Sequence, residues 1–268
     1  MEKLIITTIQ TNLHWENKTA NLEMLEKKVL GIAEKTNVVL LPEMFSTGFS
    51  MQPALFAETM EGETVNWMRH LAKQKNIILG GSIMVSENDV YFNRFVWMQP
   101  NGQFGFYDKR HCFSLAGEDQ HYGSGNKRTI ASVGGWKINL QICYDLRFPV
   151  WSRQQLQQDE QNNFNPEYDV LVYVANWPER RSNAWKTLLQ ARAIENQSFV
   201  FGVNRVGNDG NQIYHSGDTM VVDPMGEVLY QNAHNEDIHT ITIEKNKLRE
   251  VREKLPFWKD GDGFLIVD

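Results

Sequence analysis

One of the two cysteines in the chain stands where a nucleophile could be presented. Cys143 ends the run 137–143 (KINLQIC), in which apolar and polar side chains alternate. Because side chains alternate across a strand, Cys143 shares a polar face with Asn139 and Gln141, where a core thiol is not expected. Residues 144–149 lead into a predicted helix, whose N-terminus would lower the thiol pKa and offer backbone N–H groups to an oxyanion. The alternative is a small buried apolar residue, the usual role of a lone cysteine.

Two ionisable residues elsewhere follow predicted strands and could serve such a thiol. Glu43 comes directly after the apolar run 38–42, and open α/β sheets place ligands beyond the carboxyl ends of their strands. A carboxylate there could act as a general base. Lys109 ends the predicted strand 104–108 and can face a site while Asp108 faces away. Taken singly, each residue also fits a solvated surface position.

The second cysteine, Cys112, is predicted to be structural. It is adjacent to His111, but neighbouring residues on a strand point to opposite faces. The two side chains therefore do not form a nucleophile–base pair.

The elements that must position these residues alternate between strands and helices. Strands are predicted at 4–10, 38–41, 77–85, 90–98, 104–108, 136–143, 169–175, 199–205, 220–222, 228–231 and 239–243. Helices are predicted at 17–36, 63–76, 183–197 and 245–254, and a further one begins near 149 and gives way to a Gln/Asn-rich loop by 165. No internal repeat, long linker or change of composition occurs, so a single α/β domain over residues 1–268 is expected.

Composition argues against two classes of partner. The net charge is −6 and basic runs are short, whereas nucleic-acid binders concentrate Lys and Arg on one face. No stretch approaches the roughly 20 apolar residues of a membrane span, and residues 1–6 lack the features of a signal peptide. We therefore expect a cytoplasmic protein with reduced thiols and no nucleic-acid or membrane partner.

Taken together, three segments resemble the nitrilase superfamily of carbon–nitrogen hydrolases. They are residues 41–44 (LPEM), 107–111 (YDKRH) and 142–149 (ICYDLRFP). The resemblance extends through 169–175, 193–196 (AIEN) and 222–227 (VDPMGE), and so covers nearly the whole chain. In that family a Glu, a Lys and a Cys in this order form the catalytic triad, which implies these roles for Glu43, Lys109 and Cys143.

The resemblance also implies an architecture and a fourth active-site residue. The fold would be a four-layer αββα sandwich of the nitrilase type, paired into a homodimer, with no metal or other cofactor. Consistently, the 7 His lack metal-ligand spacing and no Cys-x-x-Cys occurs. The family has a second active-site glutamate after the lysine, for which Glu118 is the candidate, with Asp119 adjacent.

Within the family, three further segments look like the ω-amidase branch, which hydrolyses 2-oxoglutaramate. They are residues 109–113 (KRHCF), 175–178 (ANWP) with Arg181, and 204–210 (NRVGNDG). Cys112 replaces the usual leucine of the branch, and we expect this small apolar exchange to be tolerated. The predicted reaction is hydrolysis of the terminal amide of 2-oxoglutaramate or 2-oxosuccinamate to the dicarboxylate and ammonia.

The predicted chemistry is a two-step hydrolysis through a Cys143 thioester. Glu43 accepts the thiol proton, and the oxyanion lies between the Lys109 ammonium and the Tyr144 backbone N–H. Glu118 holds Lys109 or the substrate in position.

Substrate binding is assigned to Tyr144, Trp177 and Arg181. Trp177 would line the carbon chain, and Arg181 would bind the free carboxylate. Arg147 is a second candidate, expected instead in a structural salt bridge. The alternative functions are an aliphatic amidase, an N-carbamoyl hydrolase, a nitrilase or a non-catalytic scaffold, and the complete triad argues against the scaffold.

Overall fold

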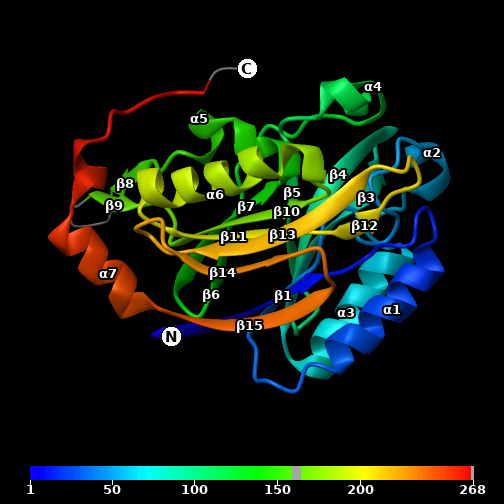
Figure 1. Ribbon diagram of the computed structural model, residues 1–268, viewed down its shortest axis with the longest axis horizontal. Helices are drawn as coiled ribbons and strands as arrows, with labels where there is room; N and C mark the ends of the chain where they lie inside the picture. Colours follow the sequence, from blue (N-terminus) through cyan, green and yellow to red (C-terminus); the bar gives the residue numbers. More distant parts are fainter. Residues whose placement is uncertain (159–163, 267–268) are drawn as a thin grey trace.

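The computed structural model describes residues 1–158 and 164–266, and its centre is a pair of stacked β-sheets (Figure 1). The first sheet has the strand order β15 (Asp237–Glu244), β1 (Lys3–Gln10), β2 (Val38–Leu40), β3 (Ile78–Glu87), β4 (Val90–Met98) and β5 (Phe104–Asp108). In it β1, β2 and β3 are parallel, and the outer strands pair antiparallel.

The second sheet is built around three parallel strands. Its order is β12 (Val206–Asn208), β13 (Tyr214–Val222), β11 (Phe199–Asn204), β10 (Val170–Ala175), β7 (Trp136–Ile142) and β6 (Ile130–Val133), with β14 (Val228–Ala233) beside β13. Strands β7, β10 and β11 run parallel, so their carboxyl ends meet at one edge. A separate hairpin pairs β8 (Leu156–Gln158) with β9 (Phe164–Pro166).

Helices cover the outer face of each sheet (Figure 1). Helices α1 (Lys18–Leu30) and α3 (Glu63–Lys75) lie together against the first sheet, and α6 (Ser182–Asn196) packs on the second. Helix α7 (Lys245–Lys254) follows β15. The shorter helices are α2 (Pro53–Phe56), α4 (Glu118–His121), α5 (Pro149–Ser152), η1 (Ser114–Ala116), η2 (Cys143–Arg147), η3 (Glu179–Arg181) and η4 (Phe257–Asp260). The expectation of a four-layer αββα sandwich is confirmed.

Residues 38–41, which precede Glu43, are buried on both faces of the first sheet, and this explains why all four are apolar. Val38 and Leu40 belong to the apolar cluster that joins the two sheets and α6. Val39 and Leu41 point the other way, into the cluster beneath α1 and α3. Burial on both faces is typical of a central parallel strand, and it fixes the point from which the chain leaves toward Glu43.

Several predicted boundaries were wrong. The first helix ends at Leu30 rather than 36: Gly31 is its C-cap, and the next N–H, that of Ile32, bonds to the Val29 carbonyl oxygen instead of continuing the i to i−4 pattern. The helix expected after residue 149 is the four-residue α5, and the Gln-rich segment beyond it lacks an apolar period; part of this segment, 159–163, lies outside the described residues. Strand β13 begins at Tyr214 rather than 220. Its first half was missed because that half is polar in sequence, although most of it is buried.

Among the described residues, no helix combines the length and apolar character needed to cross a membrane.

Candidate active site

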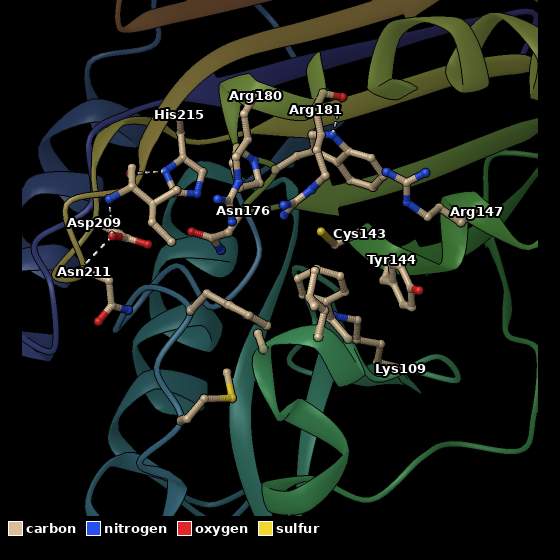
Figure 2. A pocket seen from close by; sticks show the side chains of 18 residues that line it. Lys109, Cys143, Tyr144, Arg147, Asn176, Arg180, Arg181, Asp209, Asn211 and His215 are labelled. Atoms are coloured by element: carbon tan, nitrogen blue, oxygen red, sulfur yellow. Dashed lines mark hydrogen bonds between the residues drawn. The ribbon is translucent and has the colours of Figure 1, made fainter. Parts of the chain in front are cut away.

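The predicted site residues meet at the carboxyl ends of strands from both sheets. Glu43 follows β2 and Lys109 follows β5, so both come from the first sheet. Cys143 follows β7 and begins η2, in the second sheet. Lys109 and Cys143 line a pocket of about 250 Å³, shown in Figure 2. The seam between the two sheets therefore brings these three residues together.

Lys109 is the centre of a buried charged cluster. Its Nζ lies 2.9 Å from Glu43 Oε1 and 2.8 Å from Glu118 Oε2, and all three side chains are at most 1% exposed. Burial alone would lower the pKa of Lys109, yet the Glu118 and Glu43 carboxylates hold it well above its usual value. Burial raises the pKa of Glu118, against the opposing effect of Lys109. The ammonium is therefore permanently charged and fixed in place.

Glu43 is also bonded to the second sheet. Its Oε2 accepts a hydrogen bond of 2.8 Å from the Asn176 backbone N–H, and its carbonyl oxygen accepts one of 2.6 Å from Asn176 Nδ2. Asn176 directly follows β10. A carboxylate whose oxygens are both occupied by donors has one orientation, so Glu43 is aimed rather than free to rotate.

The turn that presents Cys143 is strained and tightly tied. Cys143 has φ +43°, a left-handed conformation that costs a non-glycine residue about 1–2 kcal/mol. The buried Asp145 carboxylate stabilises the turn by accepting hydrogen bonds from Ile142 N–H (3.0 Å) and Tyr107 Oη–H (2.7 Å). It also accepts from the backbone N–H (3.0 Å) and Nδ1 (2.8 Å) of His111. Asp145 thus joins the nucleophile turn to the segment that carries Lys109.

The expectation of a lowered thiol pKa is wrong. Burial, followed by the nearby Glu43 carboxylate, raises the pKa of Cys143 well above its usual value, and Lys109 only partly opposes this. The helix after the thiol is the five-residue η2, and its terminus does not offset the loss of solvent. The resting thiol is therefore protonated, and it needs an adjacent base before it can attack.

Arginines gather at the outer part of the pocket. Arg147, Arg180 and Arg181 all line it, and Arg147 and Arg181 reach toward the side where Cys143 lies (Figure 2). Within residues 1–158 and 164–266, none of the three forms an ion pair with a carboxylate. Burial lowers the pKa of Arg181, and the neighbouring Arg180 and Arg147 lower it further.

Two aromatic rings support these guanidinium groups. Arg181 lies 5.0 Å from the Phe113 ring centroid, and Arg147 lies 4.9 Å from that of Trp177. The salt bridge expected for Arg147 is absent from the described part of the chain, and Asp145, the carboxylate of the same turn, is bonded to Ile142, Tyr107 and His111 instead. Trp177 also donates from Nε1 to the Arg181 carbonyl oxygen at 2.8 Å, and Tyr144 lines the same pocket.

Sequence reasoning did not identify several residues of the site. Asn93, in β4, donates to Glu43 and Glu118, and Asn176 was noted only as part of a motif. Asp209, Asn211 and His215 line the side of the pocket away from Arg147 (Figure 2). The one signal for Asn93 was a small amide within an otherwise largely apolar strand.

Cys112 does not line the pocket. It is partly buried, with Sγ 3.7 Å from the Tyr122 carbonyl oxygen, and burial raises its pKa to about 11. No cluster of three or more His, Cys, Asp or Glu residues suited to a metal ion occurs in the described part of the chain.

Comparisons with known proteins agree over the full length of the chain. The pattern of the carbon–nitrogen hydrolase family matches residues 5–253. The ω-amidase YafV of Escherichia coli K12 is 43% identical over 267 residues, which is 99% of this chain and 100% of that protein. The 2-oxoglutaramate amidase of Bacillus subtilis is 30% identical over 261 residues, 96% of this chain and 97% of that one.

Solved structures show the same fold. The CN-hydrolase superfamily protein XC1258 of Xanthomonas campestris, solved with an arsenic adduct in its active site, has a TM-score of 0.95 at 39% identity and covers 100% of both chains. Nit3 of Saccharomyces cerevisiae has a TM-score of 0.83 at 22% identity and covers 95% of each chain.

Proposed function

This chain belongs to the carbon–nitrogen hydrolase family, and from that premise we propose that it hydrolyses the terminal amide of a 2-oxo dicarboxylic acid monoamide. The substrates are 2-oxoglutaramate and 2-oxosuccinamate, and the products are the dicarboxylate and ammonia. The names of its relatives in E. coli and B. subtilis support this substrate class.

In the first step, Cys143 attacks the amide carbon while Glu43 takes the thiol proton. The protonated resting thiol and the buried carboxylate beside it support this pairing, since such a thiol needs a base. Negative charge develops on the amide oxygen, between the Lys109 ammonium and the Tyr144 backbone N–H. Loss of one such donor typically costs about 2.7–4 kcal/mol of transition-state stabilisation.

The second step releases the acid and restores the thiol. It starts from the acyl thioester on Cys143, which remains once ammonia has left with the proton that Glu43 returned. The same carboxylate then removes a proton from water as the water attacks the thioester carbon, and the proton passes to the departing sulfur. Glu118 keeps Lys109 in place throughout, as the 2.8 Å contact between them supports.

The observation that carries the substrate assignment is the group of arginines without carboxylate partners. Like charges close together in a partly buried pocket destabilise one another, and a bound anion offsets that repulsion. Arg181 binds the free carboxylate of the substrate, with the planar geometry that suits a guanidinium. Trp177 packs along the short carbon chain.

The test is ammonia release across a panel of amides, nitriles and N-carbamoyl amino acids. We expect 2-oxoglutaramate and 2-oxosuccinamate to give kcat/KM values well above those of neutral amides of equal length. A preference for neutral amides or nitriles over both keto acids would refute the substrate assignment. It would leave the chemistry of Cys143 standing.

We also propose that the protein is a homodimer working in the cytoplasm. Val150 on α5 and Ile194 on α6 are 56% and 55% exposed, and apolar side chains on this outer layer suit contact with a second copy. Both cysteines are free thiols, as a reducing compartment requires. Light scattering that gives the mass of one chain at micromolar concentration would contradict the dimer.

A further inference from the structure

Asn93 stands between the two buried glutamates. Its Nδ2 lies 2.8 Å from Glu43 Oε1 and 3.1 Å from Glu118 Oε1. Lys109 Nζ binds the same two oxygen atoms, each at 2.9 Å. The amide and the ammonium therefore hold the pair of carboxylates from two sides.

The identity of the contacting atom follows from chemistry. Ionised carboxylates only accept hydrogen bonds, and an amide NH₂ has two hydrogens, one for each glutamate. The opposite orientation would turn Oδ1 toward two acceptors. In the orientation observed, Oδ1 is buried and has no partner in the described part of the chain. The contacts to the glutamates are thus the hydrogen bonds that this side chain makes.

The backbone of Asn93 acts on the third member of the cluster. Its carbonyl oxygen accepts a hydrogen bond of 3.0 Å from the Lys109 backbone N–H, just beyond the end of β5. Asn93 itself is 1% exposed and lies in β4, which pairs with β3 on one side and β5 on the other. A single residue on a rigid strand therefore contacts Lys109, Glu43 and Glu118.

We propose that Asn93 is a positioning residue, a neutral donor that fixes Glu43 and Glu118 relative to Lys109 and keeps Glu43 aimed at the thiol. The inference rests on the proposed role of Glu43 as base, and it does not depend on which amide is hydrolysed. A neutral donor suits this position. A second cation would stabilise the charged form of Glu43 and make it a weaker base, whereas an amide orients the carboxylate without adding charge.

The test replaces Asn93 by Leu, Asp and Ser. Asn93→Leu has a similar volume without donors, so the ionised form of Glu43 loses a hydrogen bond. The acid limb of the kcat/KM profile should then move to higher pH by about one to two units. We expect kcat to fall about 10- to 100-fold with little change in KM, because Asn93 does not line the pocket. Asn93→Asp should shift the limb further through its added negative charge, and Asn93→Ser, with one hydroxyl donor, should shift it less.

Asn139→Leu is the matched control. Asn139 is equally buried in β7, the strand that ends beside Cys143, and its side-chain amide contacts none of the described polar groups. This variant should keep the wild-type pH profile. The rate of iodoacetamide inactivation without substrate gives a second pH profile that requires no amide hydrolysis.

The outcomes separate the two hypotheses. An unshifted limb in any folded Asn93 variant, or a shift equally large in Asn139→Leu, overturns the positioning role while the proposed function stands. Failure of all three Asn93 variants to fold would also overturn it, because the residue would then serve the fold alone. If the wild type hydrolyses no amide, the proposed function fails, and the inactivation profiles still decide the role of Asn93.

Discussion

The two ends of the pocket treat charge in opposite ways. At the inner end, Glu43, Glu118 and Lys109 are almost fully buried, and each carboxylate oxygen of the two glutamates has at least one donor. At the outer end, Arg147 and Arg181 rest on aromatic rings, with no carboxylate partner in the described residues. The inner end is complete as it stands, whereas the outer end lacks a counter-charge.

The inner end therefore holds the residues assigned to the reaction, and the outer end holds those assigned to substrate binding. A buried charge network is stable only when every member is satisfied, so the inner end has a single arrangement ready before substrate arrives. An unpaired cation at an accessible surface costs far less, and it can be paired by each new ligand. Substitutions at the inner end should therefore lower kcat, and substitutions at the outer end should raise KM.

The largest effect should come from the residue where the two ends meet. Cys143→Ala removes the nucleophile and should reduce turnover of 2-oxoglutaramate by about 10⁴-fold or more. Cys112→Ala is the matched control and should leave turnover largely intact, since Cys112 lies outside the pocket. Ammonia release by the purified variants measures both. An active Cys143→Ala enzyme would exclude the thioester mechanism.

The next effect tests the inner end. Glu43→Gln keeps the shape but removes the base, and turnover should fall by roughly 10²–10⁴-fold, mainly in kcat. Lys109→Met removes the cation at the oxyanion and should be comparably damaging. It also leaves two buried carboxylates unpaired, so its melting temperature should drop as well. If both variants fold and keep near wild-type kcat, the inner end is not the catalytic machinery.

A smaller effect tests the outer end. Arg181→Ala should raise KM for 2-oxoglutaramate by roughly 10- to 100-fold, the usual worth of a hydrogen bond to a charged group, and leave neutral amides nearly unaffected. Arg249→Ala, at an exposed arginine paired with Glu2, makes the same change in net charge and should alter neither. A uniform loss on charged and neutral amides would assign Arg181 to structure rather than recognition.

The last prediction concerns His215, which lines the side of the pocket away from Arg147, and it tests stability rather than turnover. Burial, followed by the neighbouring Arg205, lowers the pKa of His215 to about 4. Below the unfolded pKa of about 6.5 the unfolded chain binds a proton that the folded chain excludes, so stability is lost as pH falls from about 6.5 to 4, by ~3 kcal/mol at most. His215→Gln should flatten this part of the urea-derived profile of unfolding free energy against pH. A wild-type slope in the variant would assign the pH dependence to other groups.

The sequence predicted which charged residues meet at the inner end of the pocket, but it did not predict the direction of the Cys143 pKa shift. Glu43, Lys109 and Cys143 each follow a strand, and α/β sheets place ligands beyond the carboxyl ends of their strands. Asn93 could not be singled out, because Asn139 is an equally buried amide in an equally apolar strand and contacts no site residue. What distinguishes Asn93 is its hydrogen bonds to Glu43 and Glu118, which are distant in sequence, and a local pattern does not contain such contacts.

The predicted bounds of helices and strands were likewise right where the pattern is local and wrong where it depends on distant segments. Helix α7 was predicted with its observed bounds, because its pattern is local and unbroken. The polar start of β13 was missed, because its burial depends on strands that are distant in sequence. The sign of the thiol pKa shift was wrong for a related reason. It depends on how completely the neighbouring segments exclude water from Cys143, and a single strand-and-turn motif does not determine this.

The raised pKa of Cys143 has a consequence for the lifetime of the enzyme. Peroxides and other electrophiles attack thiolates, and a protonated thiol is a poor target for them. Between turnovers the sulfur is therefore shielded from oxidation to sulfenic and sulfinic acids. In the proposed mechanism it becomes strongly nucleophilic only when an amide carbon lies in front of it and Glu43 removes the proton.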